Sequence, residues 1–392
     1  MRSYLRAYFD RLGAIPSRDE FKLDLIDGFA GGGTFLDEGK IVSGSPLVML
    51  EESEAAKDRL QRGRSKFLHF DFKFYFVDVE APHTDHLRKV LAEQGYTADG
   101  KHILVRNCPF EDSVEDIIAE VRRRQPRAGR AIFLLDQCGF SQVTFAHIAK
   151  IFRQLPTAEV ILTFAADSLI NFLAATPSIV QASAPIELSE TQILELIELR
   201  NRDGGRALVQ RVIREHIRTA TGATYDTPFF IRPRTSRRAL WFLHLSRHPT
   251  ARDVMIQCHW NALNTFEHYG PGDFGMLGWD ALNSGTLTLF NFEELEAEQL
   301  RTQLLDSMPA ELFTLAADTP ITVDTMRHMF ANRTAAQFSD LDLVVLELAK
   351  EKEIDILDVD GKLRSRTLRR LRQTDRIAIP QTLLLPGFSR RR

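Results

Sequence analysis

Residues 23–35 (LDLIDGFAGGGTF) constrain the fold of this chain more than any other segment. An apolar run with the composition of a buried strand ends in Asp27 and continues into a turn that contains four glycines. Glycines allow a tight turn and a close approach of the backbone to a ligand, and an acid at the strand end can order the loop or bond a ligand amine. The segment predicts a ligand-binding loop, but glycines alone also fit a loop that holds no ligand, or a nicotinamide or flavin site.

The sequence around this loop has the pattern of a parallel sheet with crossover helices. From residue 22 to about 165, short β-rich apolar runs alternate with segments whose apolar residues recur at helical spacing,. Val114, Ile117, Ile118 and Val121, for example, lie on one face of a helix,. Five such steps favour a doubly wound α/β domain, with strands expected at residues 22–27, 74–78, 102–106, 131–136 and 160–165,.

The glycine segment resembles the DxFAGxG signature of class I S-adenosylmethionine-dependent methyltransferases. The resemblance implies a Rossmann-like sheet of that type and S-adenosylmethionine as cofactor. Asp78 at the end of the second strand is then placed to accept hydrogen bonds from the two ribose hydroxyls, and Asn107, Cys108 and Phe110 stand where such enzymes hold the adenine,. The residues by themselves leave three alternatives open: a solvated acid at Asp78, an inert buried thiol at Cys108 and core packing at Phe110.

The fourth expected strand delivers another acid to the same edge of the sheet. Asp136 ends the run, and Gln137, Cys138 and Gly139 follow it. In amino-methyltransferases the matching DPP(Y/F) motif orients the target amine, so the resemblance assigns the catalytic positions to Asp136 and Gln137. Gln137 replaces the first proline of that motif and Cys138 the second. This departure leaves open that the acid persists in a relative that binds without methylating.

Over residues 20 to 390 the chain is more similar still to the three-Cys-motif partner (TcmP) family, whose members read roughly IDGFAGPG, GSPL, a strand-end acid and DPFG, and finish in a winged-helix-like tail. The corresponding segments here are IDGFAGGG at 26–33, GSPL at 44–47, FVD at 76–78 and LDQCGF at 135–140. Asp167, Asn171 and Phe172 follow the fifth strand. The family name refers to a cysteine motif in a partner protein that is itself similar to radical S-adenosylmethionine enzymes, so the resemblance implies such a partner.

These two resemblances together define the expected cofactor site. Its residues come from the glycine loop, from the GSPL segment and from the ends of the second and third strands. The expected cofactor-binding residues are Asp27, Gly28, Phe29, Ala30, Gly31, Gly33, Ser45, Asp78, Cys108 and Phe110.

A strong charge asymmetry marks the C-terminal end. The net charge is −3, but from residue 361 onward there are ten Lys and Arg against one acid, so this end carries +9 and the rest −12. Such a distribution indicates a local contact with a polyanion, or a partner contact, although a solubilising basic tail has the same composition. The residues expected to contact nucleic acid or a partner are Lys362, Arg364, Arg366, Arg369 and Arg370.

Two domains joined by a linker helix are expected along the chain. Residues 1–290 form the methyltransferase-like domain, with a less regular insertion at about 180–225, and two strands at 227–233 and 238–246 close one edge of its sheet,. A linker helix covers 291–308. Residues 309–392 contain a helix from Ser339 and then a two-stranded ribbon, formed by Ile354 to Val359, a turn at Asp360 and Gly361, and a second strand from Leu363 onward,. Helix, helix and basic ribbon are the layout of a winged-helix-like domain.

The cysteine spacing is typical of a protein in a reducing compartment, and the hydropathy is typical of a protein without a membrane helix. Cys108, Cys138 and Cys258 show no CxxC spacing, and no apolar run approaches the length of a membrane helix, so a cytoplasmic protein without membrane contact is expected,. His244, His248, Cys258 and His259 cluster in the sequence, but no metal site is expected.

Three functions follow from these observations. The first is methyl transfer from S-adenosylmethionine to an acceptor on a nucleic acid or presented by a partner. The second is a catalytically altered, methyltransferase-like recognition subunit of a two-protein system, for example in defence against mobile DNA. The third is a nuclease, although no nuclease motif stands out in the sequence,.

Overall fold

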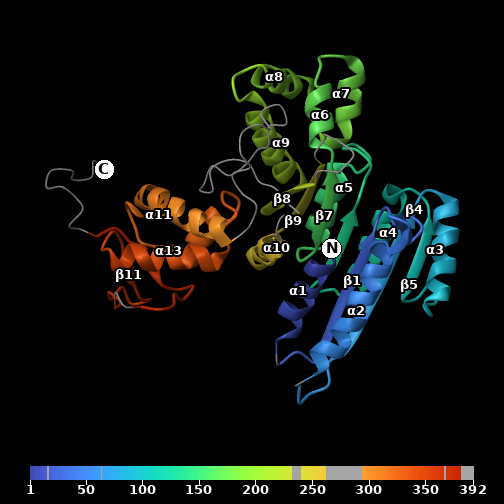
Figure 1. Ribbon diagram of the computed structural model, residues 1–392, viewed down its shortest axis with the longest axis horizontal. Coiled ribbons are helices and arrows are strands. Elements are labelled where there is room, and N and C mark those ends of the chain that lie inside the picture. The colour runs from blue at the N-terminus through green and yellow to red at the C-terminus, as the bar shows by residue number, and fades with distance from the viewer. Residues whose placement is uncertain (16, 63, 232–239, 262–293, 366–367, 381–392) are drawn as a thin grey trace. The chain divides into compact units, whose positions relative to one another are not determined.

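The computed structural model describes all residues except 16, 63, 232–239, 262–293, 366–367 and 381–392 (Figure 1). The chain divides into two compact units, Met1–Cys258 and His259–Arg392. The domain boundary expected at residue 290 lies outside the described residues.

The first unit contains a seven-stranded sheet with the order β5-β4-β1-β6-β7-β9-β8 among the described residues. The first five strands of this order are parallel, and β9 is antiparallel to β7 and β8. All five predicted strands are confirmed, and so is the edge pair. This large, mostly parallel sheet confirms the expected α/β class. Its strands are β1 (Glu20–Asp27), β4 (His69–Asp78), β5 (Ile103–Asn107), β6 (Ala131–Leu135), β7 (Glu159–Phe164), β8 (Tyr225–Ile231) and β9 (Leu240–Ser246).

Burial on both faces explains why the central strands read as continuous apolar runs. Every residue of β6 and β7 is buried, as expected for parallel strands covered by helices,. Right-handed crossovers place α2 (Ser45–Gln61) and α3 (Ala81–Glu93) on one face, and α4 (Phe110–Arg124) and α5 (Phe145–Gln154) on the other (Figure 1),. The predicted face of α4 is confirmed, because Val114, Ile117, Ile118 and Val121 are all buried.

The remaining helices of the first unit flank this arrangement. Residues 166–221, which span most of the expected insertion, are largely helical, and Ser189 and Gln192 form a capping box at the start of α8. These helices are α1 (Arg2–Gly13), α6 (Ala166–Phe172), α7 (Pro177–Ser183), α8 (Glu190–Arg200), α9 (Gly205–Thr221) and α10 (Pro249–Asn261), which extends a few residues past the unit boundary. In the part of the chain that the structure describes, no helix is long and apolar enough to cross a membrane.

The second unit combines three helices with a small sheet of order β10-β12-β11 in its described part. The predicted helix from Ser339 is confirmed as α13, which buries Leu341, Val344, Val345 and Leu348. α11 continues through Pro309, where the C-terminal domain was expected to begin. The elements are α11 (Glu294–Ala316), β10 (Ile321–Thr322), α12 (Val323–Phe330), α13 (Phe338–Lys350), β11 (Asp355–Leu357) and β12 (Arg376–Ala378).

The predicted ribbon strand from Leu363 is wrong. Leu363 makes only an isolated bridge to Leu357, and the partner strand of β11 is β12. Burial explains the difference, because Ile377 of β12 is fully buried whereas Leu363 is exposed. The described residues 358–365 and 368–375 therefore lie in the long connection between β11 and β12.

Candidate functional site

The candidate site lies at the carboxyl ends of β1, β4 and β6. The chain runs from β1 to β4 and β5 on one side and returns to β6 and β7 on the other, so the strand order reverses between β1 and β6. Open α/β sheets bind ligands at such a reversal, outside the carboxyl ends of the strands. Asp27 ends β1, Asp78 ends β4, and Asp136 directly follows β6.

Hydrogen bonds hold the glycine loop to β4 and β6, the two strands that flank β1. The N–H of Gly28 donates to the Leu134 carbonyl at 2.9 Å, and the N–H of Ala30 donates to the Val77 carbonyl at 2.9 Å. A Cβ atom on Gly28 would lie 2.8 Å from side-chain carbons of both Leu135 and Phe110, so the loop has no room for a side chain there. Gly31 has a φ of +58°, and no atom lies within 4 Å of where its Cβ would be. The loop is thus tight on its inner side and open to a ligand at Gly31.

The GSPL segment packs directly on this loop. A hairpin of β2 (Thr34–Asp37) and β3 (Lys40–Ser43) connects the two, which accounts for the long separation between Gly33 and Asp78. The N–H of Gly44 donates to the Gly33 carbonyl at 2.7 Å, and a Cβ atom on Gly44 would lie 2.8 Å from that oxygen. Gly44 therefore lets α2 begin beside the glycine loop, with Ser45 as its first residue.

Asp27 is a fully buried acid within the site. Its Oδ1 accepts the Phe29 N–H at 3.1 Å, and its Oδ2 has no hydrogen-bond partner among the described residues. Burial raises the pKa of Asp27 to about 7, and the nearby charges of Asp136 and Asp78 add to this effect. The Ser45 hydroxyl opposes the shift, without completing a hydrogen bond to Oδ2. A cation beside Oδ2 would therefore find an acid that ionises near neutral pH.

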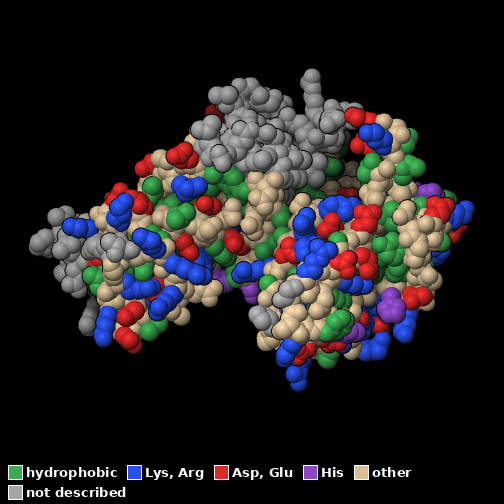
Figure 2. Space-filling view, turned by 60° about the horizontal axis from the view of Figure 1, so that its bottom comes forward, with side chains coloured by type: hydrophobic (Ala, Val, Ile, Leu, Met, Phe, Trp, Pro, Cys, Tyr) green, Lys and Arg blue, Asp and Glu red, His purple; other side chains and the backbone are tan. Residues whose placement is uncertain are grey.

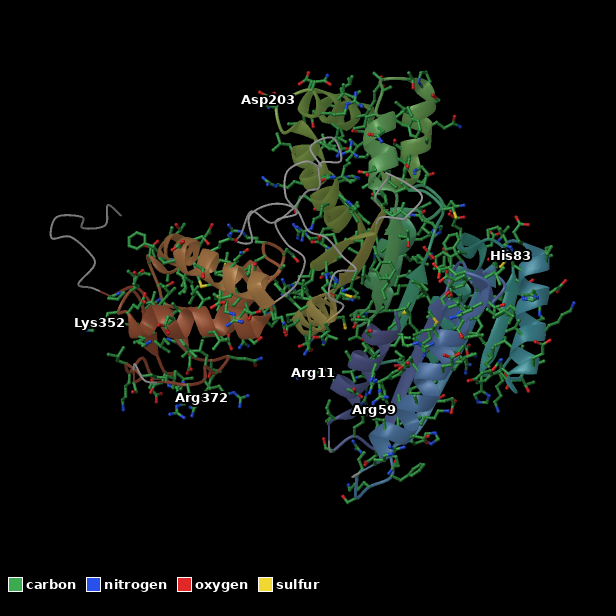
Figure 3. All side chains as sticks on the ribbon, in the orientation of Figure 1. Arg11, Arg59, His83, Asp203, Lys352 and Arg372 are labelled. Carbon is green, nitrogen blue, oxygen red and sulfur yellow. The ribbon has the colours of Figure 1, made fainter. Side chains whose placement is uncertain are left out.

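Asp78 ties the glycine loop to the start of α3. Its Oδ2 accepts the Gly31 N–H at 2.8 Å, and its Oδ1 accepts the Glu80 N–H at 2.8 Å. The Nδ1 atom of His83 lies 3.2 Å from the same Oδ1, and the His83 side chain is 54% exposed (Figure 3). Sequence reasoning missed His83; its only signal is a histidine five residues after the acid, in the first turn of α3.

The segment expected to hold the adenine contains residues that support the loop and one residue that is partly exposed. Asn107 Nδ2 donates to the carbonyls of Asp78 and Val79 at 3.1 and 2.9 Å, and the Cys108 N–H donates to the Asp78 carbonyl at 3.2 Å. Phe110 is 4% exposed, and its ring centre lies 6.5 Å from that of Phe29. The Phe110 side chain therefore packs beneath the glycine loop, while Cys108 is half-buried at the surface of the site.

Asp136 and Gln137 have different surroundings. Asp136 is exposed, and the Thr163 hydroxyl donates to its Oδ1 at 2.5 Å. Gln137 is 2% exposed, and its Oε1 accepts the N–H groups of Gln142 and Val143 at 2.9 and 3.0 Å. Gln137 therefore fixes the loop after β6, and Asp136 is the residue presented to solvent. Sequence reasoning missed Thr163, whose only signal is its place near the end of the neighbouring strand.

Replacing Gln137 with Ala is expected to lower the free energy of unfolding by about 1–3 kcal/mol, because the Gln142 and Val143 N–H groups lose their acceptor,. Urea titration measures the change. Gln142→Ala is the matched control, because the exposed Gln142 side chain accepts only the Cys138 N–H among the described residues. Equal stability of the two variants would contradict this role of Gln137.

The basic residues expected to contact a partner differ in availability. Lys362, Arg369 and Arg370 are exposed, Arg366 lies outside the described residues, and Arg364 forms an ion pair with the buried Asp375. Within the described ranges, no three His, Cys, Asp or Glu side chains lie together as metal ligands.

Comparison with known proteins shows only distant structural similarity. No family model matches the chain, and no curated protein matches its sequence. Among solved structures, a protein from Legionella pneumophila is 8% identical, with 65% of this chain and 89% of that one covered and a TM-score of 0.34. The plantazolicin methyltransferase BamL, solved with S-adenosylhomocysteine (SAH), is 12% identical, with coverages of 63% and 85% and a TM-score of 0.24. Trm1 from Pyrococcus horikoshii, solved with S-adenosylmethionine, is 10% identical, with coverages of 97% and 91% and a TM-score of 0.28. At these scores the site is argued from its own residues.

Proposed function

We propose that the first unit binds S-adenosylmethionine at the carboxyl ends of β1, β4 and β6 and transfers its methyl group to a second substrate. The observation that carries this proposal is the buried carboxyl group of Asp27, whose Oδ2 is unpartnered among the described residues and which lies beside two further acids and an open glycine loop. A buried carboxyl group whose Oδ2 is unpartnered among the described residues favours a cationic ligand, and S-adenosylmethionine carries positive charge on its amine and its sulfonium,. The residues therefore fit the cofactor.

The roles of the other residues follow from their positions. Asp78 would hold the ribose, the open side of Gly31 would admit the ligand, and Cys108 would border the adenine. When bound, S-adenosylmethionine supplies an electrophilic methyl group. The protein then has mainly to hold the acceptor in line with it, and Asp136 is placed to do this because Thr163 fixes one of its oxygens,.

The proposal extends to a nucleic-acid or partner-presented acceptor. The C-terminal unit has two helices, α12 and α13, followed by the paired strands β11 and β12, which supports a winged-helix-like domain. The similarity to the three-Cys-motif partner family supports a second protein with a three-cysteine motif. The nucleic-acid source of the acceptor is tested separately from the cofactor site.

A second function is favoured by one observation. Gln137 stands where the family has proline, and its Oε1 is engaged by backbone N–H groups of its own loop rather than presented at the surface. This arrangement suits a protein that keeps the pocket but works as a recognition subunit without methylating. Substitution of Asp136 separates the two functions.

Isothermal titration with S-adenosylmethionine and S-adenosylhomocysteine tests the cofactor site. The wild type is expected to bind both ligands, and Asp78→Ala is expected to weaken binding at least about tenfold, because it removes both the ribose acceptor and the anchor of the Gly31 N–H,. Asp85→Ala is the matched control, because Asp85 is exposed on α3 and pairs only with Arg88 among the described residues. Absence of binding by the folded wild type would overturn the proposal.

A further inference from the structure

The loop between β11 and β12 is held in a defined shape. We call its described residues, 358–365 and 368–375, together with Arg376 at the start of β12, the basic wing loop. At one end, Asp358 Oδ1 accepts the N–H groups of Asp360 and Lys362, both at 2.9 Å. At the other end, the buried Asp375 accepts the Arg372 N–H at 2.8 Å and pairs with Arg364. These contacts fix the backbone from which the basic side chains project.

Most cations of the basic wing loop project into solvent. Arg364 is the exception, because its charge is used by Asp375. Within the described part of the chain, the others form no ion pair with an acid, and Figure 3 shows Arg372 on the side of the unit away from α11. Figure 2 shows Lys and Arg side chains on the surface of this unit, at the left of the view. The exposed cations are Lys362, Arg369, Arg370, Arg372 and Arg376.

The neighbouring helix α13 has the opposite charge. Asp342 pairs with Arg327 at 2.5 Å, Asp340 lies 3.6 Å from Arg301, and Glu347 pairs with Lys350 at 2.9 Å. In helix-turn-helix proteins the second helix enters the major groove and reads base edges. An acidic helix in that position would be repelled by the phosphates on both sides of the groove. Base reading by α13 is therefore disfavoured.

The composition of the basic wing loop favours a phosphate backbone over an acidic protein. All of its cations except Lys362 are arginines, whose planar guanidinium group binds phosphate through two parallel hydrogen bonds,. The loop contains no aromatic residue. Protein interfaces, in contrast, usually depend on buried aromatic and arginine anchors together.

We infer that the basic wing loop binds the phosphate backbone of a nucleic acid without reading its sequence, and that α13 stays out of the groove. The inference extends the proposed function by naming a nucleic acid as the macromolecule that carries the methyl acceptor. Only this part of the inference rests on the proposed function. Binding through phosphates alone is steeply salt-dependent and insensitive to sequence.

Fluorescence anisotropy of the full chain with labelled duplexes tests the inference. The arms are two short DNA duplexes of unrelated sequence, an RNA duplex and polyglutamate, all without cofactor. The two DNA sequences are expected to bind equally well. Arg369→Ala/Arg370→Ala is expected to weaken binding at least about tenfold and to lower the slope of log K against log salt by about 2, because about one counterion is released per phosphate contact.

Arg6→Ala/Arg11→Ala removes two exposed arginines of α1 and is expected to leave binding unchanged. A preference for DNA or RNA supports the inference and identifies the backbone. Absence of duplex binding, wild-type binding by the folded double variant, strong discrimination between the DNA sequences, or tighter binding of polyglutamate would each overturn it. Because these titrations contain no cofactor and the calorimetry contains no nucleic acid, either proposal can fail alone.

Discussion

Replacing Asp27 with Asn is expected to stabilise the protein above pH 7 while weakening S-adenosylmethionine binding at least about 30-fold. The carboxyl group is fully buried, and its pKa is raised from 3.8 to about 7. A buried acid favours its neutral form, and Asn imitates that form while it still accepts the Phe29 N–H,. Loss of a charge that faces a buried ligand cation typically costs about 2 kcal/mol or more. Stability and binding therefore change in opposite directions.

The contribution of Asp27 to the free energy of unfolding decreases as the pH rises,. Because the folded pKa lies above the unfolded one, the stability that Asp27 contributes is fully present below about pH 4 and is lost as the pH rises to about 7,. The loss is at most about 4 kcal/mol, from roughly three pH units at 1.4 kcal/mol each. Asp27→Asn does not ionise, so its advantage over the wild type grows across this range. Wild-type affinity for S-adenosylmethionine should fall below about pH 7, because Asp27 must ionise to hold the amine.

Urea titration across this pH range and calorimetry at its upper end measure the two effects. Asp24→Asn is the matched control, because Asp24 is also fully buried in β1 but pairs with Arg124. Burial raises the pKa of Asp24 to about 6, so this variant should also gain stability at high pH, but it is expected to leave ligand binding unchanged,. An Asp27→Asn variant that is less stable than the wild type at every pH, or that binds normally, would contradict the assignment of Asp27 to a cationic ligand.

The central sheet was predictable because its signals are local. Apolar runs and helical periods mark each strand and helix, and a parallel sheet brings the carboxyl ends of its strands to one edge, so the convergence of Asp27, Asp78 and Asp136 followed from strand order alone,. The glycine motif further indicated where the chain approaches a ligand.

The partners of the polar side chains could not be predicted in the same way. Thr163 contacts Asp136 only because β6 and β7 pair in one register. Arg364 pairs with Asp375, eleven residues away, only because the loop folds back on itself. The choice of β12 over Leu363 as the partner of β11 depends on which residue the core buries. Such choices are made by long-range packing, for which a single sequence carries little signal.

Replacing Asp136 with Ala is expected to lower methyl transfer about 100-fold or more while S-adenosylmethionine binding stays within about threefold of the wild type. The carboxyl group lies at the exposed end of β6, outside the contacts that hold the glycine loop, so its loss affects the orientation of the acceptor rather than the cofactor. Misplacement of a reacting group by about 1 Å costs a factor of this order. Transfer of a labelled methyl group to total nucleic acid, beside calorimetry, measures the two quantities.

Thr163→Val provides the graded comparison that separates the two functions. The variant keeps the Asp136 carboxylate but removes the hydroxyl that donates to Oδ1, so it should retain more transfer than Asp136→Ala and less than the wild type,. A wild type that transfers methyl groups and loses this activity in that order is a methyltransferase with Asp136 in contact with the acceptor. The alternative result is that nucleic-acid binding and cofactor binding persist while neither substitution changes any measured activity. Asp136 is then a retained strand-end acid, and the arrangement of Gln137 belongs to a protein that recognises its partner without modifying it.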